Sequence, residues 1–380
     1  MKSFLSRTRG AWFVALLSIL IASLGCSGGD DDEGAIKIAL EGPLTGEQAS
    51  NGLDMLRGVQ LAVSEVNAKG GVLGRRVKLI EADDGADPEL AELVARSVYD
   101  QGAVAVIGPY NSSVGLKNLP LYTSLQVVPI HLVSADETTG LGLTIQPRNS
   151  QISPVEVGYI AALKPATVVL LIDPSAYTQS MADRLEAGLA AQGIIVARIL
   201  IQTSQSDYTA AVREALDLGP QVVYSSTYFP EGALIAKALA AEALLGRDAE
   251  CFMGLANQDP AFVAAAGIAD SQRCVFSGVP APEQFPSAAG YVAAYREQFP
   301  GATPGVWGTF TYDSARMLFV AMEQVGTTDY EPVLATLLVT VGYPGATGAI
   351  TIDPGTGNRT NVPVRILRVT PAGGFAVVDS

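Results

Sequence analysis

A short loop containing two serines is the part of this sequence best suited to holding a ligand. The loop 108–113 reads GPYNSS, follows the apolar run 103–107 and precedes a helical pattern. Backbone N–H groups at the start of a helix are free to bind an anion, and the hydroxyls of Ser112 and Ser113 can donate beside them. These residues predict an anion site, for example for a carboxylate. The alternative is that Ser112 or Ser113 only caps its helix.

The sequence offers little of the chemistry that an enzyme requires. His131 is the only histidine, and HExxH, GxSxG, phosphate-loop and CxxC patterns are absent from the sequence. Asp83 and Asp84 are adjacent acids, but neighbours along a strand point to opposite sides, which does not suit a glycosidase pair. We expect no enzymatic activity, no catalytic residue, no metal site and no cofactor.

Two cysteines, Cys251 and Cys274, each directly precede a short apolar run that is typical of a strand. Neighbouring strands of a parallel sheet would bring the two thiols side by side at one end. In an exported protein such a pair favours a disulfide. Two buried free thiols are the alternative, and a zinc site is disfavoured because the chain has one histidine.

Residues 1–25 have the order of a secretory signal peptide, with basic residues, the apolar run 11–24 and then Gly25 before Cys26. A run of this length is short for a membrane span, which needs about 20 residues. Cys26, which begins the polar tether 26–35, resembles the lipidated cysteine of bacterial lipoproteins, although the residues before it depart from the usual pattern. We expect export and a lipid anchor at Cys26 in the cell envelope. An ordinary signal peptide that is cleaved nearby is the alternative.

The charge of the chain excludes some partners. Removing residues 1–25 takes away three basic and no acidic residues, so the net charge changes from −14 to −17. Such an acidic surface repels nucleic acid and anionic lipid headgroups. Because 48% of the residues are hydrophobic and 16% are charged, the chain is expected to be globular, and its length suits two domains. The membrane is therefore expected as a partner only through the lipid anchor.

Short β-branched runs alternate with helical patterns from residue 36 onward, which is typical of parallel sheets flanked by helices. A first block predicts strands at 36–41, 76–82, 103–107 and 127–130 and a helix at 52–68. After the region 147–154, a second block predicts strands at 167–173, 194–201, 221–226, 251–255 and 274–279 and helices near 178–191, 208–218 and 231–245.

Two such blocks predict an α/β fold with two doubly wound parallel-sheet lobes, and a single eight-fold barrel is the structural alternative. The last part of the chain predicts helices near 286–298 and 309–325 and strands at 363–369 and 374–378. The simplest arrangement has several crossings between the lobes. It assigns 36–148 and about 280–338 to the first lobe, and 149–279 and about 339–380 to the second.

Many segments of the chain are similar, in order and approximate spacing, to the branched-chain amino-acid binding proteins of bacterial ABC importers. The matching segments are 36–46 (IKIALEGPLTG), 57–60 (RGVQ), 67–71 (NAKGG), Asp83-Asp84, Asp87-Pro88, 107–113 (IGPYNSS), Asp173 with Tyr177, 228–231 (YFPE), 251–254 (CFMG), Tyr312-Asp313 and 345–353 (GATGAITID). This resemblance implies the type I periplasmic binding fold, in which a multi-strand hinge joins two lobes. It also implies a ligand between the lobes and delivery of that ligand to a membrane permease.

The resemblance implies ligand contacts from both lobes. In the family the loop equivalent to 108–113 holds a carboxylate, so Tyr110, Asn111, Ser112 and Ser113 are expected at the ligand. Tyr177 and Tyr228 match aromatic positions that pack on the ligand from the opposite lobe, where tyrosine supplies an apolar face and one hydroxyl.

A further segment, 131–138, follows the strand 127–130 and matches one that donates to the same carboxylate in the family. It places Ser134 or Ala135 at the usual hydroxyl position, and Ala135 there would remove one donor. His131 lies near this mouth, where it either contacts the ligand or has a structural role.

The sequence departs from the family where carboxylates commonly pair with the ligand's amino group. It has Asn149-Ser150 in the crossing between the lobes and Leu255-Ala256-Asn257 after 251–254. A buried ammonium without an anionic partner is costly, so an ordinary amino acid is a doubtful ligand, with Asn257 as a neutral contact. Asp136, Glu137 or Glu231 could substitute for the missing carboxylate.

These features predict an extracytoplasmic, monomeric solute-binding protein of an ABC importer, which closes over a small amino-acid-like, carboxylate or amide ligand. The alternative is a ligand-sensing receptor of the same fold, because transport and signalling can use the same clamp. Neighbouring permease and ATPase genes would favour transport, and a kinase or regulator gene would favour sensing. A surface protein that uses the cleft for adhesion would show no saturable binding of small molecules.

Overall fold

A four-stranded parallel sheet organises the first part of the chain in the computed structural model, which describes residues 34–378. Its order is β2-β1-β3-β4, and its strands are mostly buried, as expected when helices cover both faces. The elements are β1 (Ile36–Gly42), α1 (Ala49–Ala68), β2 (Val77–Asp83), α2 (Ala91–Asp100), β3 (Ala103–Ile107), α3 (Ser112–Ser124) and β4 (Val128–Ile130).

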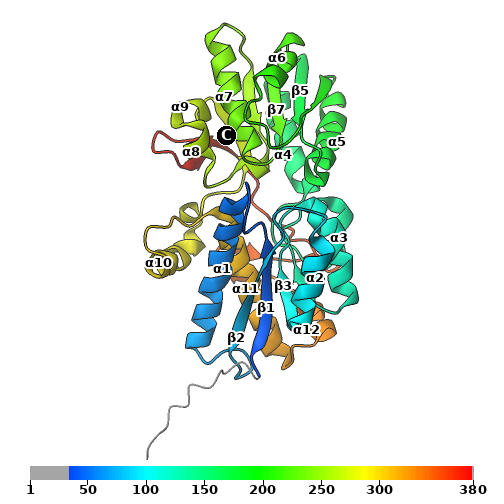
Figure 1. Ribbon diagram of the computed structural model, residues 1–380, viewed down its shortest axis with the longest axis vertical. Coiled ribbons are helices and arrows are strands. Elements are labelled where there is room, and N and C mark those ends of the chain that lie inside the picture. The colour runs from blue at the N-terminus through cyan, green and yellow to red at the C-terminus, as the bar shows by residue number, and fades with distance from the viewer. Residues whose placement is uncertain (1–33, 379–380) are drawn as a thin grey trace, which may run out of the picture. The chain divides into compact units, whose positions relative to one another are not determined.

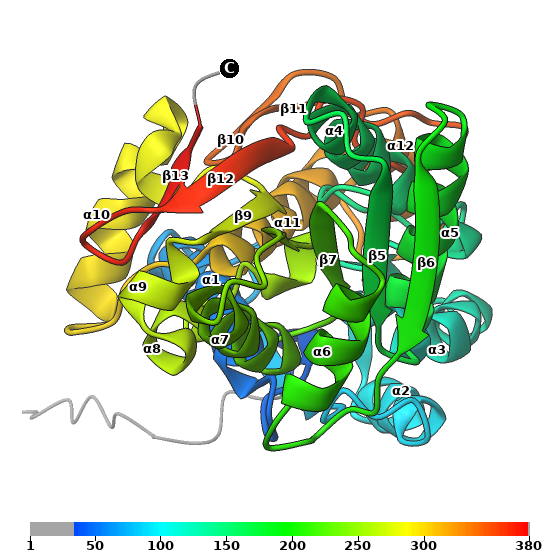
Figure 2. The same cartoon turned by 90° about the horizontal axis from the view of Figure 1, so that it is seen from above.

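A seven-stranded sheet of order β13-β12-β9-β8-β7-β5-β6 organises the second part. The five strands from β5 to β9 run parallel to one another. Strand β12 pairs antiparallel with β9, and β13 pairs antiparallel with β12, so both extend the sheet beyond β9 (Figure 2). The elements are α4 (Asn149–Ala162), β5 (Thr167–Ile172), α5 (Ala176–Ala190), β6 (Ile195–Leu200), α6 (Thr209–Asp217), β7 (Val222–Ser226), α7 (Glu231–Leu244), β8 (Glu250–Met253), α8 (Phe262–Ala266), α9 (Ile268–Ser271), β9 (Cys274–Gly278), β12 (Arg365–Val369) and β13 (Phe375–Val377).

Both sheets carry helices on their faces (Figure 1), so the predicted fold of two doubly wound α/β lobes is confirmed and the barrel alternative is wrong. We call the parts built on the two sheets the first and the second lobe. The predicted signal peptide 1–25, the predicted lipidation site Cys26 and most of the predicted tether 26–35 lie outside the described residues.

Helix α11 (Val306–Val325) returns the chain to the first lobe, where it packs closely on α1. A Cβ atom at Gly58 would lie 2.0 Å from the carbonyl oxygen of Gly308, so the two backbones are nearly in contact. The carboxylate of Asp54 accepts hydrogen bonds from the N–H groups of Gly305 and Gly308 at 2.9 and 2.7 Å, which satisfies the start of α11.

The segment after α11 differs from the expected division. The sequence predicts 339–380 in the second lobe, but only β12 and β13 join that sheet. The hairpin of β10 (Tyr343–Gly345) and β11 (Gly348–Ile350) instead contacts α11, where Asp313 accepts hydrogen bonds from the N–H groups of Ala346 and Thr347. The other boundaries stay a prediction. Two further helices, α10 (Ala289–Gln298) and α12 (Tyr330–Leu338), complete the strands and α-helices of residues 34–378.

Two buried carboxyl groups lie at the ends of β1 and β2, beneath the candidate site. Glu41 and Asp84 are both fully buried, and Glu41 accepts hydrogen bonds from Asn118 and Tyr122. Burial raises the pKa of Asp84 to about 7, whereas the N–H of Ala86 acts in the opposite direction. Burial and then the charge of Asp84 raise the pKa of Glu41 as well. Both groups therefore hold a proton more readily in the folded protein than in the unfolded chain.

Protein stability is therefore expected to fall as the pH rises through about 7, because the folded state holds a proton on Asp84 that the unfolded chain has already lost. The variant Asp84→Asn should reduce the loss of unfolding free energy between pH 5 and 8 by about 2 kcal/mol. Urea unfolding at both pH values measures this effect. Asp207→Asn is the control, since hydrogen bonds from Thr209 lower the pKa of the exposed Asp207 and its loss should shift both values equally. An unchanged difference in Asp84→Asn would contradict the prediction.

Candidate functional site

The loop with two serines lies at the carboxyl end of β3 and leads into α3. Gly108 has a φ of +118°, and a Cβ atom there would lie 2.0 Å from the carbonyl oxygen of Glu41. Only glycine allows the loop to approach β1 so closely. Asn111 is the residue that precedes α3, and its side chain makes no capping hydrogen bond.

Neither serine of this loop caps α3, so that alternative is wrong. The Ser112 hydroxyl accepts a hydrogen bond from the N–H of Ala135 at 3.3 Å. The Ser113 hydroxyl accepts one from the N–H of Ala176 at 3.0 Å, at the start of α5 in the second lobe. The two side chains thus join the start of α3 to segments far away in the sequence.

The segment after β4 is held in place from inside the protein. The guanidinium group of Arg148, which is fully buried, donates to the carbonyl oxygens of Val133 and Ala135 at 3.0 and 2.6 Å. Ser134 donates to the carbonyl oxygen of Pro147 and accepts from Gln146. The backbone that carries Ser134 and Ala135 is therefore fixed beside the loop 108–113, which we call the serine loop.

Of the two expected alternatives for the hydroxyl position, Ala135 offers its N–H to Ser112, while Ser134 supplies the hydroxyl near the cavity described below. His131 is 2% exposed, and its Nδ1 atom accepts a hydrogen bond from the N–H of Val133 at 3.2 Å. Burial and the nearby charge of Arg148 lower the pKa of His131. His131 lines neither of the cavities described below, which fits the structural role expected as one alternative.

Three tyrosines from the two lobes meet between the serine loop and the second sheet. The ring of Tyr228 lies 6.0 Å from that of Tyr110 and 5.4 Å from that of Tyr177, measured between ring centroids. Trp307 of α11, which no sequence motif predicts at the site, has its ring 5.7 Å from that of Tyr110. Aromatic contacts at such distances favour a fixed arrangement.

The hydroxyl of Tyr228 lies at the start of α3, where the sequence predicts an anion site. Burial raises the pKa of Tyr228, and the charge of Asp173 acts in the same direction. The N–H of Ser112 and the side chain of Asn111 lie near enough to oppose that shift. The N–H of Ser112, at the start of α3, thus lies near a polar oxygen from the second lobe.

A small cavity lies among these groups, with a volume of about 10 Å³, which is about what one water molecule requires. The tyrosine rings therefore fill most of the space between the lobes at this point. Residues from both lobes line it, namely Tyr110, Ser112, Leu132, Ser134, Gln146, Tyr177, Tyr228, Leu255 and Ala256. Ala256 is apolar, and it belongs to the segment 255–257, where the resemblance described above implies a carboxylate in related proteins.

A larger cavity of about 510 Å³ lies beside the first and shares Tyr228 with it. Asn111 and Ser113 line it from the first lobe, whereas Asp173 and Glu231 line it from the second. Burial raises the pKa of Asp173 and of Glu231, and hydrogen bonds oppose both shifts. Glu231, expected only as a possible substitute carboxylate, is thus part of the larger cavity.

Two of the predicted contacts line neither cavity. Ala135 is fully buried in the segment that Arg148 holds, and Asn257 donates from its amide to the carbonyl oxygen of Thr227 at 3.0 Å. A Cβ atom at Gly232 would lie 1.8 Å from the amide oxygen of Asn257, so this side chain is packed against α7. Asn149 similarly donates to the carbonyl oxygen of Tyr177. The asparagines after β8 and at the start of α4 therefore contact backbone beside the site and do not line its cavities.

Several hydrogen bonds between the lobes lie close to these cavities. Ser113 accepts from Ala176, as described, and Ser50 of α1 donates to the carboxylate of Asp259 at 2.7 and 2.8 Å. The hydroxyl of Ser204 donates to Glu47 at 2.9 Å. Burial raises the pKa of Asp259 to about 6. The candidate site is thus enclosed between segments that contact each other directly.

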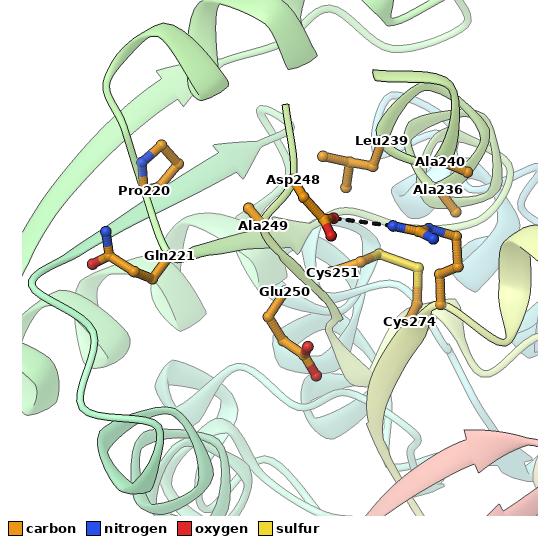
Figure 3. A pocket seen from close by; sticks show the side chains of 11 residues that line it. Pro220, Gln221, Ala236, Leu239, Ala240, Asp248, Ala249, Glu250, Cys251 and Cys274 are labelled. Atoms are coloured by element: carbon orange, nitrogen blue, oxygen red, sulfur yellow. Dashed lines mark hydrogen bonds and ion pairs between the residues drawn. A yellow bond between two sulfur atoms is a disulfide. The ribbon is translucent and has the colours of Figure 1, made fainter. Parts of the chain in front are cut away.

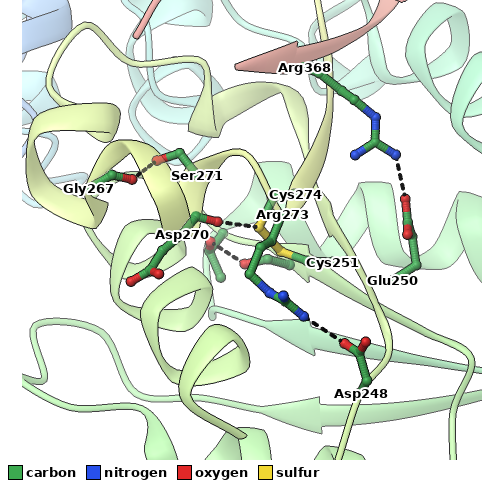
Figure 4. Close-up of a disulfide and its surroundings, with 11 residues drawn as sticks. Asp248, Glu250, Cys251, Gly267, Asp270, Ser271, Arg273, Cys274 and Arg368 are labelled. Atoms are coloured by element: carbon green, nitrogen blue, oxygen red, sulfur yellow. Dashed lines mark hydrogen bonds and ion pairs between the residues drawn. A yellow bond between two sulfur atoms is a disulfide. The ribbon is translucent and has the colours of Figure 1, made fainter. Parts of the chain in front are cut away.

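A further cavity, of about 530 Å³, lies at the amino ends of β7, β8 and β9 (Figure 3). In open α/β sheets, ligands bind at the carboxyl ends of the strands, so this cavity is on the wrong edge for the expected site. Cys251 and Cys274, which are paired residues of β8 and β9, form a disulfide beside it (Figure 4). Arg273 and Asp248 form an ion pair at 3.0 Å over the same edge.

Two properties of residues 34–378 bear on other kinds of site. Among them, no group of three or more histidine, cysteine or acidic residues is arranged to hold a metal ion. The same part of the chain contains no helix with the length and apolar character needed to cross a membrane.

Comparison with known proteins gives relatives over most of the chain. A leucine-, isoleucine-, valine-, threonine- and alanine-binding protein of Pseudomonas aeruginosa is 31% identical over 316 residues, which are 80% of this chain and 82% of that protein. A Leu/Ile/Val-binding protein homologue of Brucella abortus is 26% identical over 89% of this chain and 90% of its own length. A third, Leu/Ile/Val-binding protein BraC3 of Rhizobium johnstonii, is 34% identical, but the match spans 54% of this chain and 58% of that relative.

Solved structures share the fold at low sequence identity. A leucine binding protein LivK from Thermotoga maritima has a TM-score of 0.82 and 23% identity, covering 91% of this chain and 98% of its own. A solute binding protein of an ABC transporter from Rhodopseudomonas palustris, in complex with 3,4-dihydroxy benzoic acid, has a TM-score of 0.79 and 20% identity over 90% of this chain and 96% of its own. The family model described as periplasmic binding protein matches residues 35–374. With that match over most of its length, the chain belongs to the periplasmic binding protein family.

Proposed function

We propose that this protein is the extracytoplasmic solute-binding component of an ABC importer, and that it closes its lobes over a small solute. The observation that carries the proposal is the meeting of Tyr110 from the first lobe with Tyr177 and Tyr228 from the second at one cavity. A site made from two lobes is assembled by their closure, so binding and closure are coupled. The related proteins named above, several of which bind small amino acids, support a solute of that size.

The polar groups of the site support a carboxylate or amide in the solute. Ser112 and Asn111 direct N–H groups toward the oxygen of Tyr228, and a solute oxygen that displaces this hydroxyl would receive the same donors. Gln146, which is 1% exposed, has a side-chain oxygen without a partner in the structure. A donor on the solute, such as an amide N–H, would satisfy it.

Binding to purified residues 35–380 tests the proposal. After unfolding and refolding to remove bound solute, a thermal-shift screen of amino acids, amides and short carboxylates should give at least one saturable shift. A solute at 100 times its dissociation constant adds about 2.7 kcal/mol of stability if it binds only the folded protein. The hit should then be confirmed by calorimetry.

The variant Ser112→Ala is expected to weaken binding of that solute by about tenfold, because it removes a hydroxyl at the start of α3. Ser271→Ala is the matched control, since Ser271 is also a buried helical serine but donates within α9 to Gly267. Equal affinities of the two variants would contradict the proposed site. An unresponsive panel would contradict solute binding itself.

Transport also requires partners outside this chain. We propose that a permease receives the solute and that the protein acts as a monomer held to the membrane by a lipid on Cys26. The signal-peptide pattern and the family membership support export. Mass spectrometry of the protein from its own membranes would detect the lipid on Cys26. Genes for a permease and an ATPase beside this one would support transport, whereas a kinase gene in their place would contradict it.

A further inference from the structure

The larger cavity between the lobes is lined by carboxylates and contains no basic side chain. Its volume of about 510 Å³ lies in the usual range for small-molecule sites. Glu47 lines it from the first lobe, and Asp173 and Glu231 line it from the second. Across the part of the chain that the structure describes, none of these three acids belongs to an ion pair.

The carboxylates are near enough to repel one another. Glu231 is 4% exposed, and after burial and its hydrogen bonds the charges of Asp173 and Glu47 act to raise its pKa. Asp173 is 1% exposed and is held by hydrogen bonds from Ser175, Thr178 and Tyr228. Like charges gathered in a partly buried space destabilise each other unless a cation lies between them. These residues have no such cation in the protein itself.

A separate observation at the same cavity also requires a hydrogen-bond donor. Asn111 is 4% exposed and lines the cavity, and its amide donates to Gln48 at 2.8 Å. Its amide oxygen has no partner in the structure. A buried amide oxygen without a donor costs about 1 to 3 kcal/mol. A group that both donates hydrogen bonds and carries positive charge would therefore satisfy Asn111 and the carboxylates together.

We propose that this cavity accepts a primary ammonium group of the solute, between Glu47, Asp173 and Glu231 and beside the amide oxygen of Asn111. The inference rests on the proposed function, because the ammonium group belongs to the solute that the lobes enclose. A primary ammonium has three donors, and the ring of Tyr228 on the wall offers it a further favourable contact. The proposed position of the ammonium group is thus away from Ala256, the apolar residue that lines the smaller cavity.

Calorimetric titration with putrescine, ornithine and leucinamide, each beside its N-acetylated counterpart, tests this inference on residues 35–380. At least one free amine should bind about tenfold or more tightly than its acetylated form, which lacks the positive charge. Glu231→Gln should remove most of that preference, and Glu47→Gln, which changes an exposed residue, should reduce it. Glu214→Gln is the control. Glu214 is exposed on α6, and its replacement by glutamine makes the same change in net charge.

The outcomes separate the inference from the proposed function. If free and acetylated forms bind equally, or if Glu231→Gln and Glu47→Gln bind as Glu214→Gln does, the ammonium site is wrong. Binding of an uncharged amide or carboxylate that depends on Ser112 would then leave the proposed function standing. If neither these amines nor the wider panel binds, both the inference and the proposed function are wrong.

Discussion

Replacing Arg148 by methionine is expected to lower the free energy of unfolding by about 3 kcal/mol or more, because it leaves several buried acceptors without a donor. Its guanidinium group donates to the carbonyl oxygens of Val133 and Ala135 and to the hydroxyls of Thr138 and Thr139. Burial lowers the pKa of Arg148 to about 10, while the charge of Asp136 opposes the shift. Arg148 therefore remains charged at neutral pH and holds the segment 133–139 from within.

The same variant is expected to weaken solute binding by about tenfold, because Ser134 lies on the segment that Arg148 fixes. Arg359→Met is the matched control. Arg359 is 1% exposed and donates in the same way to Thr347 and Ala349, but in the hairpin region away from both cavities. Both variants should lose stability in urea unfolding, and only Arg148→Met should lose affinity.

Equal affinity of the two arginine variants would show that Arg148 does not position the site. If Arg148→Met fails to fold, Arg148→Lys provides the second test, since lysine keeps the charge but not the planar group that reaches two carbonyl oxygens together. Arg148→Lys should fold and should still bind the solute more weakly than the unchanged protein.

Removing the disulfide is expected to cost about 3 kcal/mol of stability. Cys251 and Cys274 are 23 residues apart in the sequence, and a cross-link that closes a loop of this length restricts the unfolded chain by about that amount. The double variant Cys251→Ala with Cys274→Ala, compared in urea unfolding with the unchanged protein, measures the effect. Solute affinity should be unchanged, because the cysteines lie at the amino ends of β8 and β9.

A reducing agent provides the control for this prediction. It should destabilise the unchanged protein by a similar amount and leave the double variant as it is. Detection of two reactive thiols after unfolding the protein without a reducing agent would contradict the cross-link. It would support the alternative of two free cysteines instead.

Strands and most helices of the fold could be predicted because they depend on local patterns. The β-branched runs of β1, β3 and β5 and the helical spacing of α1 are present in short windows of sequence. The sequence does not predict helix α4, because Pro147 and Pro154 favour a crossing between the lobes, whereas the helix begins at Asn149 and contains Pro154. The hairpin of β10 and β11 was assigned to the second lobe, since its partner Asp313 is more than 30 residues away.

The site was predicted in part, for a related reason. Ser112, Tyr177 and Tyr228 each follow or precede a strand, which marks the edge of the sheet where ligands bind. Trp307 lies in the middle of a helical pattern, and nothing local indicates that α11 brings it to Tyr110. Asn257 follows a strand as expected, but its side chain turns toward α7, which depends on the closeness of Gly232. Contacts made over long distances in the sequence were thus beyond prediction.

The position of Trp307 makes the protein report on its own cleft by fluorescence. The chain has two tryptophans, Trp12 and Trp307. In a protein that starts at residue 35, tryptophan fluorescence therefore has a single source, Trp307. That source is 1% exposed and lies 5.7 Å from Tyr110, which in turn contacts Tyr228 of the other lobe. A movement of Tyr228 that admits water or a solute is expected to change the polarity around the indole ring of Trp307. The wavelength of maximum fluorescence emission should then shift. Opening and closing can therefore be followed in solution without attaching a dye.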